Sequence, residues 1–542
     1  MARERSSDAA KEKAPRARLA LAYPLFRVGA KARHLLFVPP DSRPGNAASG
    51  QRILAAADPL SWRAAAGEAE IEPHRFAWLR DLRAVGGDAA RQRGQNLIKD
   101  WISRYGEAPR RPLWTPEILA DRLVHWIGQF DFFGKPAPQS WKALFFRSLA
   151  HQALALARAA PRVAATAERT RALRALIAFG AAVPGAQTRL ARALGLLIPT
   201  LEALPGHGAI VERNPSDQLA VLRDLVDTRA ALVAAHHDPQ PVLDAAIARA
   251  GRALAALRHG DGGLALFHGG GEEDRTLIDA VLALAGAEAA APSRFSGGFE
   301  RAACGDALLF LDGAPPPPRH HDRAAHAGTL AFELSAGVQR LIVNCGTYRG
   351  SNAGWRDAGR MTAAHSTLIV GDRNSAEVRS SGGLGHWPAE TTCDRQEEGG
   401  AVWIAASHDG YLRRFGVLHR RRLFLAADGA DLRGEDRLAP AAGKRIPRRT
   451  LGTPFSIRFH LHPGLTVGEP ERDAAGASAV PFASAESGPW QLIAERGLAT
   501  TVEESFYLGR GGAPKKTRQI VLAGKIDNDA GRDARWAIKR MR

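Results

Sequence analysis

The chain has 542 residues, too many for one hydrophobic core, so its length predicts two or three domains. Its 45% hydrophobic and 24% charged residues are typical of a globular protein, and no apolar run approaches the roughly 20 residues that a membrane-spanning helix needs. The 74 lysines and arginines exceed the 56 acidic residues, for a net charge of +18. This charge favours a polyanionic partner, whether nucleic acid, anionic lipid or acidic polysaccharide, although it also fits basic residues spread over solvated surfaces.

Residues 1–45 are predicted to form a basic tail that is partly disordered. Residues 1–18 carry charges of both signs, and the short apolar stretch 19–26 contains Pro24 and is followed by no small-residue cleavage site. These features make a poor secretory signal, and a basic tail leading into an amphipathic helix fits better. The cysteines show no disulfide or metal-binding spacing and are predicted to be small buried hydrophobic residues. They are Cys304, Cys345 and Cys393.

Residues 46–288 are predicted to form a helical domain. Its segments are rich in alanine, leucine and arginine, with apolar residues at three-to-four-residue spacing, and proline, glycine and asparagine separate them. Because short connections make consecutive helices antiparallel neighbours, the domain is expected to be a bundle or an (α/α) toroid of helical hairpins. The clearest helical segments are 141–159, 169–181, 188–204, 216–235 and 241–259.

The character of the sequence changes near residue 290. In residues 289–542, short apolar or alternating runs are separated by glycine, proline, aspartate and asparagine. This pattern predicts an antiparallel β-sandwich, with the proline-rich break 314–318 as a loop inside that domain. The expected strands are 307–311, 328–334, 339–344, 366–370, 401–406, 421–426, 456–462, 491–495, 499–507 and 519–522.

Motifs in both halves resemble those of the heparinase II/III-like polysaccharide lyases. In the second half, a histidine opens a strand, a later strand ends in Asn-Cys-Gly, and an arginine precedes an Ala-His-Ser-Thr run. In the first half, the turn 206–218 before a leucine-rich helix resembles a turn of the family's toroid. The resemblance extends from about residue 170 to 510, and it implies an (α/α) toroid followed by a β-sandwich. The motif residues of the second half are His326, Asn344, Arg360 and His365.

The resemblance also implies an activity and a location. Characterised members of the family cleave uronic-acid-containing polysaccharides by β-elimination, which would make an acidic polysaccharide the partner of this chain. The reaction needs a group that neutralises the uronate carboxylate, a base that removes the C5 proton, and an acid that protonates the leaving oxygen. Two alternatives stay open, a non-catalytic glycan-binding protein that kept the fold and a basic nucleic-acid-binding protein. The family's substrates imply the cell envelope or periplasm, while the N-terminus leaves a cytoplasmic location open.

One structural divalent metal ion, zinc, is a further implication of the resemblance. His326 and His365 match the family's two histidine ligands, and Asn344 falls where the family has an aspartate. Imidazole is an ordinary zinc ligand, whereas an amide oxygen is a poor substitute for a carboxylate. We expect the three side chains to converge within the reach of one ion. The alternative is a hydrogen-bonded pair of histidines in a polar pocket.

The family's usual catalytic tyrosine is replaced in this chain. Asp217 stands at its position, and no tyrosine occurs between Tyr105 and Tyr348. An ionised Asp217 would repel a uronate carboxylate. We therefore expect either that Asp217 is turned away as a helix cap and Tyr348 acts as the base, or that the protein binds glycan without cleaving it. Tyr348 is otherwise a half-buried loop aromatic.

Four further residues complete the predicted site. Asn214 is predicted to donate a hydrogen bond to an oxyanion, and Arg360 to pair with a carboxylate in catalysis. Arg213 and Arg356 are predicted to bind substrate. The alternative roles are structural, a helix cap for Asn214 and an ion-pair partner for Arg360. We expect the two domains to meet in a cleft lined by arginines, including Arg213 or Arg360.

Overall fold

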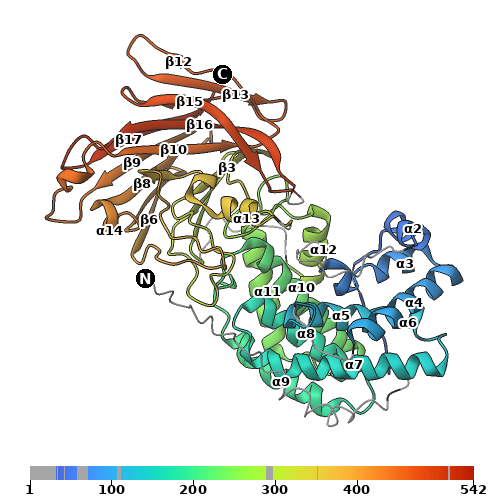
Figure 1. The fold of residues 1–542 in the computed structure, drawn as a ribbon. Helices are drawn as coiled ribbons and strands as arrows, with labels where there is room; N and C mark the ends of the chain where they lie inside the picture. The colour runs from blue at the N-terminus through green and yellow to red at the C-terminus, as the bar shows by residue number, and fades with distance from the viewer. Residues whose placement is uncertain are drawn as a thin grey trace, which may run out of the picture.

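The computed structural model shows a helical domain and a β domain side by side (Figure 1). It describes residues 32–541 except 33, 42, 58–70, 107–111, 288–296, 351 and 511–512. Most of the predicted basic tail, residues 1–45, therefore lies outside the described residues. Within the described ranges, no helix is long and apolar enough to cross a membrane. Cys304 and Cys345 are buried, and Cys393 is partly buried.

The helices of the first half pack as neighbours around the buried helix α8 (Thr166–Ala182). This helix contacts α5, α9 and α10 and is buried on nearly all sides, as expected for a helix without a solvated face. Proline occupies the first position of α5, α10 and α11, where the missing N–H group costs no hydrogen bond. The other helices are α2 (Ala47–Ala55), α3 (Leu79–Val85), α4 (Gly87–Tyr105), α5 (Pro116–Gly128), α6 (Phe130–Phe133), α7 (Gln139–Ala159), α9 (Gln187–Glu202), α10 (Pro215–Ala234), α11 (Pro241–Ala256) and α12 (Arg275–Ala285).

The second half forms two antiparallel sheets. The strand order is β1-β2-β3-β4-β10-β16-β15 in the first sheet, where β5 also pairs with β10, and β11-β13-β14-β17-β9-β8-β7-β6 in the second, where β12 pairs with β13. The strands are β1 (Phe299–Cys304), β2 (Ala307–Asp312), β3 (Phe332–Ala336), β4 (Gln339–Val343), β5 (Leu368–Val370), β6 (Thr391–Glu398), β7 (Ala401–His408), β8 (Leu418–Leu425), β9 (Asp431–Ala439), β10 (Pro454–Leu461), β11 (Thr466–Val467), β12 (Glu471–Arg472), β13 (Ser478–Ser484), β14 (Gly488–Ala494), β15 (Ala499–Tyr507), β16 (Lys515–Lys525) and β17 (Arg532–Arg540). Two short helices, α13 (Ala353–Arg360) and α14 (Leu412–Phe415), lie between strands.

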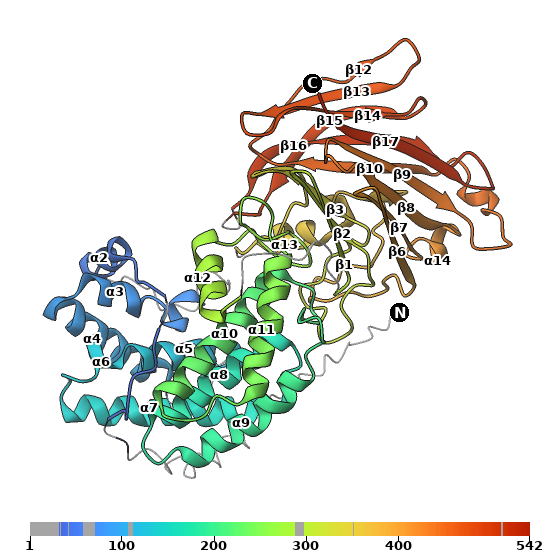
Figure 2. The ribbon, with the colours of Figure 1, turned by 180° about the vertical axis from the view of Figure 1, so that it is seen from behind.

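The first sheet joins the two domains. Strands β2, β3 and β4 are buried on both faces. Leu309 and Leu311 of β2 join the core between the sheets, whereas Phe310 packs with Phe267 from the helical half. Figure 2 shows β2 and β3 on the side of the β domain that faces the helices, with α13 at the junction.

This arrangement confirms the predicted fold class, a helical toroid followed by an antiparallel β-sandwich. Helix α12 ends at Ala285 and β1 begins at Phe299, on either side of the predicted boundary at residue 288.

Candidate active site between the two domains

A cavity of about 480 Å³ lies between the helical domain and the β domain. Its volume is in the range of small-ligand sites. Helix α8 and the turn before α10 form one wall, and the loops around α13 and residues 320–326 form the other. Among the side chains that line it are Glu117, Glu168, Arg171, Glu212, Asn214, Asp217, His268, His320, His321, Arg323, His326, Tyr348, Arg356 and Arg360.

The lining of this cavity is balanced in charge. It contains four carboxylates and four arginines, with four histidines besides. One of these arginines, Arg171, is 3.1 Å from the Glu117 carboxylate, so its charge is already compensated. The expectation of an arginine-dominated cleft is therefore corrected. Arg360 lines the cavity as expected, but Arg213 is not among its lining residues.

Arg213 ties the two domains together behind the cavity. Its guanidinium donates to the carbonyl oxygens of residues 297, 298, 314 and 315 and to the carboxylate of Asp312, which occupies all five N–H groups. The residue is 8% exposed and its guanidinium lies 4.6 Å from the centre of the Phe299 ring. Because no donor is left for a ligand, the predicted substrate-binding role of Arg213 is wrong.

Arg360 also has a structural environment. Its guanidinium donates to the backbone oxygens of Ala325, Arg379 and Gly383 at 2.7–3.1 Å, and Asp357 lies 3.8 Å away. These contacts hold two loops of the cavity wall together. The side chain is buried, and burial lowers the pKa of its guanidinium. Arg360 therefore positions the wall, and the geometry does not favour its predicted role as a catalytic partner of a substrate carboxylate.

Asn214 caps helix α10 and faces the cavity at the same time. Its side-chain oxygen accepts the N–H groups of Ser216 at 2.9 Å and Asp217 at 3.3 Å. This is the usual geometry of an N-cap residue. Because the cap uses only the oxygen, the Nδ2 amide group stays on the cavity wall as a donor. The structural and the functional interpretations of Asn214 are therefore compatible.

Asp217, at the position of the family's tyrosine, is a half-buried carboxyl on the cavity wall. Burial, followed by the negative charge of Glu212, raises its pKa from the ordinary value of 3.8 to about 7. A large share of the molecules thus carry Asp217 as a neutral acid near neutral pH. The repulsion expected between an ionised Asp217 and a uronate is reduced by this shift.

Replacing Asp217 by asparagine should stabilise the protein more at alkaline than at acidic pH. The folded protein keeps the Asp217 proton up to about pH 7, whereas the unfolded chain loses it near pH 4. The free energy of unfolding therefore falls as the pH rises from about 4 to about 7. Asparagine does not ionise, so the variant does not show this decrease. The melting temperature of Asp217→Asn should exceed that of the wild type by a few degrees at about pH 8 and by less at about pH 5. An equal difference at both pH values, or a similar pH-dependent gain in the exposed control Asp527→Asn, would contradict the shifted pKa.

Tyr348 and Arg356 lie on the β-domain side of the cavity. The Tyr348 ring is 6.4 Å from the ring of Trp355 on α13, the helix that also carries Arg356. Gly350 leaves room for the tyrosine, because a Cβ atom at this glycine would lie 2.3 Å from the Tyr348 hydroxyl. Both predicted residues thus line the same cavity as Asn214 and Asp217.

The structure brings His326 and His365 together. The Nδ1 atom of His326 lies 3.0 Å from the Nε2 atom of His365, and the Nδ1 atom of His365 lies 2.8 Å from the Met361 carbonyl oxygen. Burial lowers the pKa of both imidazoles, that of His365 to about 4, so both are neutral at physiological pH. A neutral His365 donates to Met361 and accepts from His326. The Nε2 atom of His326 is then a buried acceptor that has no partner among the described residues.

Asn344 does not complete a metal site with these histidines. Its side-chain oxygen accepts the Ser366 N–H group at 3.0 Å, and its amide nitrogen donates to Glu333 at 3.2 Å. Within the described ranges, no group of three histidine, cysteine or acidic side chains has the arrangement of a metal site. The donor set therefore does not fit zinc, and it matches the alternative of a hydrogen-bonded histidine pair.

Sequence reasoning missed several buried groups around the cavity. The Glu212 carboxylate accepts the Thr166 N–H group at 2.5 Å and lies 2.7 Å from His321. His268 lies 3.1 Å from the Asp312 carboxylate on β2. Glu212 belongs to the turn 206–218 that resembles the family, so this motif could have indicated Glu212 as a site residue. His268 stands before three glycines, and only the contact between the domains reveals its place.

Comparison with known proteins identifies the family. Residues 289–536 match the family described as heparinase II/III-like, C-terminal. Over 533 residues the chain is 32% identical to FtsZ-localized protein C of Caulobacter vibrioides, an alignment that covers 93% of this chain and 89% of the relative. The chain belongs to the heparinase II/III-like family.

Solved structures agree with this assignment to the heparinase II/III-like family. The crystal structure of a heparinase III is 12% identical with a TM-score of 0.71, and the alignment covers 96% of this chain and 88% of that one. A heparan sulfate lyase of Pedobacter heparinus is 15% identical with a TM-score of 0.60, covering 97% and 88%. At such identities the likeness shows a shared fold.

Proposed function

We propose that this chain is a glycan lyase that cleaves a uronic-acid-containing polysaccharide by β-elimination in the cavity between the domains. The observation that carries the proposal is the composition of that cavity. A tyrosine and an arginine from the β domain and an amide and a carboxyl with a pKa of about 7 from the helical domain line one space of about 480 Å³. These are the group types that neutralise a carboxylate, remove a proton and supply a proton.

The proposed roles follow from the chemistry of each group. The Asn214 amide and the Arg356 guanidinium bind the uronate carboxylate, which makes the C5 proton more acidic. The Tyr348 oxygen, in its ionised form, takes that proton, and the C4–O bond to the leaving sugar breaks as the C4–C5 double bond forms. The neutral Asp217 carboxyl gives its proton to the leaving oxygen. Proton exchange with water then restores Tyr348 and Asp217.

The charge balance of the cavity narrows the proposed substrate. With Asp217 neutral, four arginines face the three other carboxylates, which leaves little net attraction for a densely charged polymer. A glycan with isolated uronate units, of which one occupies the cavity, fits this lining better than a densely sulfated chain. The likeness to a heparan sulfate lyase therefore supports the reaction class rather than that substrate.

The experiment is an activity assay with the full-length protein. Polymers that contain uronate units at low and high charge density are incubated with the protein, and the ultraviolet absorbance of the unsaturated product is followed. We expect product from sparsely charged polymers. A complete lack of product from every polymer would overturn the proposed activity.

A second candidate is a non-catalytic glycan-binding protein at the site of cell division. Two observations favour it, the loss of the family's tyrosine at Asp217 and the relative named as FtsZ-localized. Its location would follow from the relative's name and not from any feature of the described residues. In that case the polymers bind without being cleaved, and a fluorescent fusion of the chain gathers at the division site.

A further inference from the structure

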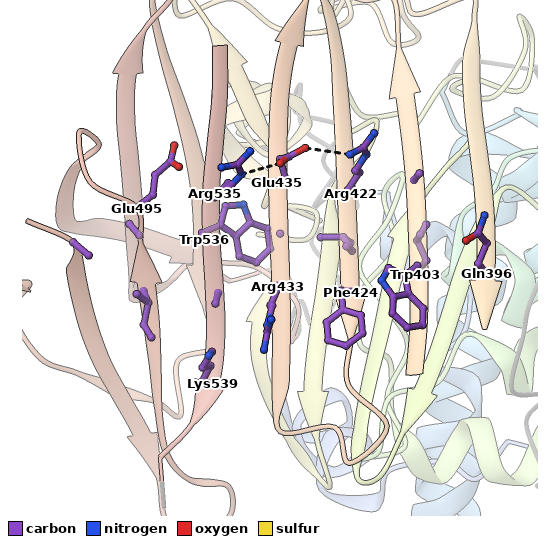
Figure 3. A pocket seen from close by; sticks show the side chains of 18 of the residues that line it. Gln396, Trp403, Arg422, Phe424, Arg433, Glu435, Glu495, Arg535, Trp536 and Lys539 are labelled. Carbon is purple, nitrogen blue, oxygen red and sulfur yellow. Dashed lines mark hydrogen bonds and ion pairs between the residues drawn. The ribbon is translucent and has the colours of Figure 1, made fainter. Parts of the chain in front are cut away.

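The outer face of the second sheet of the β domain carries a groove of about 820 Å³, separate from the cavity between the domains. Strands β6, β7, β8, β9, β17 and β14 form its floor. Figure 3 shows its side chains in two rows that cross these strands. The register of the strands explains the rows, because residues paired across antiparallel strands point to the same face.

The first row is an aromatic platform. Trp403 pairs with Phe424, and Phe424 pairs with Arg433 on the next strand. The two rings are 4.7 Å apart between centroids, and the Arg433 guanidinium lies 5.6 Å from the centre of the Phe424 ring. Beyond Arg433 the row continues with the small Ala537, which leaves depth in the floor.

Trp403 is unusually exposed for an aromatic side chain. Its side chain is 39% exposed, and it is the one aromatic residue among the large hydrophobic side chains that are strongly exposed in the described part of the chain. An indole ring that stays in contact with water lacks the free energy that burial of its large apolar surface would provide. An exposed indole on a rigid sheet therefore favours a ligand that covers it.

The second row consists of paired charges. The Glu435 carboxylate lies 2.9 Å from Arg535 and 3.6 Å from Arg422, the ladder that Figure 3 marks with dashed lines. At the end of the groove, Arg433 and Lys539 lie 2.8 and 3.6 Å from Asp431. The four cations of the groove thus share two carboxylates, Glu435 and Asp431, and the lining also carries Asp394 and Glu495, so cations and carboxylates are equal in number. A charged ligand would have to displace these partners, whereas hydroxyl groups can hydrogen-bond to guanidinium and carboxylate edges that remain paired.

We propose that this groove binds a neutral, hydroxyl-rich glycan strand, with one sugar ring stacked on Trp403 and its hydroxyl groups facing the Arg422–Glu435–Arg535 ladder. The aromatic row offers a surface for the apolar face of a sugar ring, and the charged row, two residues further along each strand, offers donors and acceptors about 7 Å away. The site lies outside the cavity between the domains. The proposed glycan binding in the groove does not depend on whether the cavity between the domains cleaves glycan. A glycan strand bound in the groove would keep the protein attached to a polysaccharide.

The test is calorimetric titration of the full-length protein with neutral hexasaccharides, namely cellohexaose, chitohexaose and maltohexaose. We expect at least one to bind with an affinity that changes little with salt, because no net charge is neutralised. Trp403→Ala should weaken this binding about tenfold or more, the size of an aromatic stacking contact. Trp403→Phe should restore most of it. The control Leu451→Ala removes a side chain of similar exposure (37%) in the same domain and should leave the binding unchanged.

Other outcomes of this titration would overturn the proposal. These are no binding of any neutral hexasaccharide by the wild type, and unchanged binding by Trp403→Ala. Tighter, salt-sensitive binding of an acidic peptide or a single-stranded oligonucleotide that Trp403→Ala abolishes, or a dimer in sedimentation that the same variant dissociates, would assign the groove to those partners. The variant Tyr348→Phe tests the cleavage reaction separately from glycan binding in the groove. It should lose cleavage of uronate polymers while keeping hexasaccharide binding, so failure of the lyase proposal and failure of this one are distinguishable.

Discussion

Replacing Tyr348 by phenylalanine is expected to lower the formation of unsaturated product by at least about a hundredfold, the usual contribution of a general base. The variant removes one oxygen atom and keeps the ring beside Trp355 and Gly350. The measurement is the initial rate of absorbance increase with the best uronate polymer, at saturating substrate. Because the ring stays in place, the fall should appear in kcat rather than in KM.

The matched control for this variant is Tyr105→Phe. Tyr105 is a half-buried tyrosine at the end of α4, where it packs on Trp101 in the helical domain away from the cavity. Its hydroxyl has no role in the proposed reaction, so the control should keep full activity. Full activity of Tyr348→Phe would remove Tyr348 from the mechanism. Asp217→Asn should then be assayed, because the other titratable group proposed for proton transfer is Asp217.

The sequence predicted the architecture because the two halves differ in hydrophobic period. Helices such as α10 and α11 show apolar residues at three-to-four-residue spacing and begin at proline. Strands such as β2 and β10 carry enough apolar residues to be recognised. Strands β1, β6, β9, β11, β12, β13 and β17 were missed. For β6, β9 and β17 the reason is the same. Their outward positions hold charged residues that are stabilised by partners on neighbouring strands, as Glu435 is by Arg535, and a single strand read by itself does not show such pairs.

The candidate site was predicted in part, for a comparable reason. Tyr348, Asn214 and Arg356 were singled out by motif or by elimination, and the structure places all three on one cavity. Arg213 and Arg360 carry the same charge as a substrate-binding arginine, but backbone carbonyl groups from distant loops take their donors. The residue type determines the charge of a side chain, but only the fold determines which hydrogen-bond acceptors lie within its reach.

The buried position of Arg213 leads to the largest expected effect on stability. Replacing it by alanine should lower the free energy of unfolding by about 3–5 kcal/mol, as for other buried ion pairs that lose one partner. Asp312 would keep a buried carboxylate with His268 as its remaining neighbour, and four backbone oxygens would lose their donor. Urea unfolding followed by circular dichroism measures the change. The control is Arg104→Ala, which removes an ion pair of a half-exposed helix arginine with Asp100 and should cost below about 1 kcal/mol.

The same variant separates a structural from a binding role for Arg213. Although burial raises the pKa of Asp312, the charge of Arg213 holds it below its ordinary value, so the folded protein contains an ionised Asp312–Arg213 pair. Asp312→Asn combined with Arg213→Ala should therefore cost less than the sum of the single changes. A substrate-binding arginine would show no such coupling and would change KM without changing stability. Loss of activity in Arg213→Ala should instead follow the loss of the folded state, because this arginine fixes the turn before α10 against the start of β1 and so positions Asn214 and Asp217 on the cavity wall.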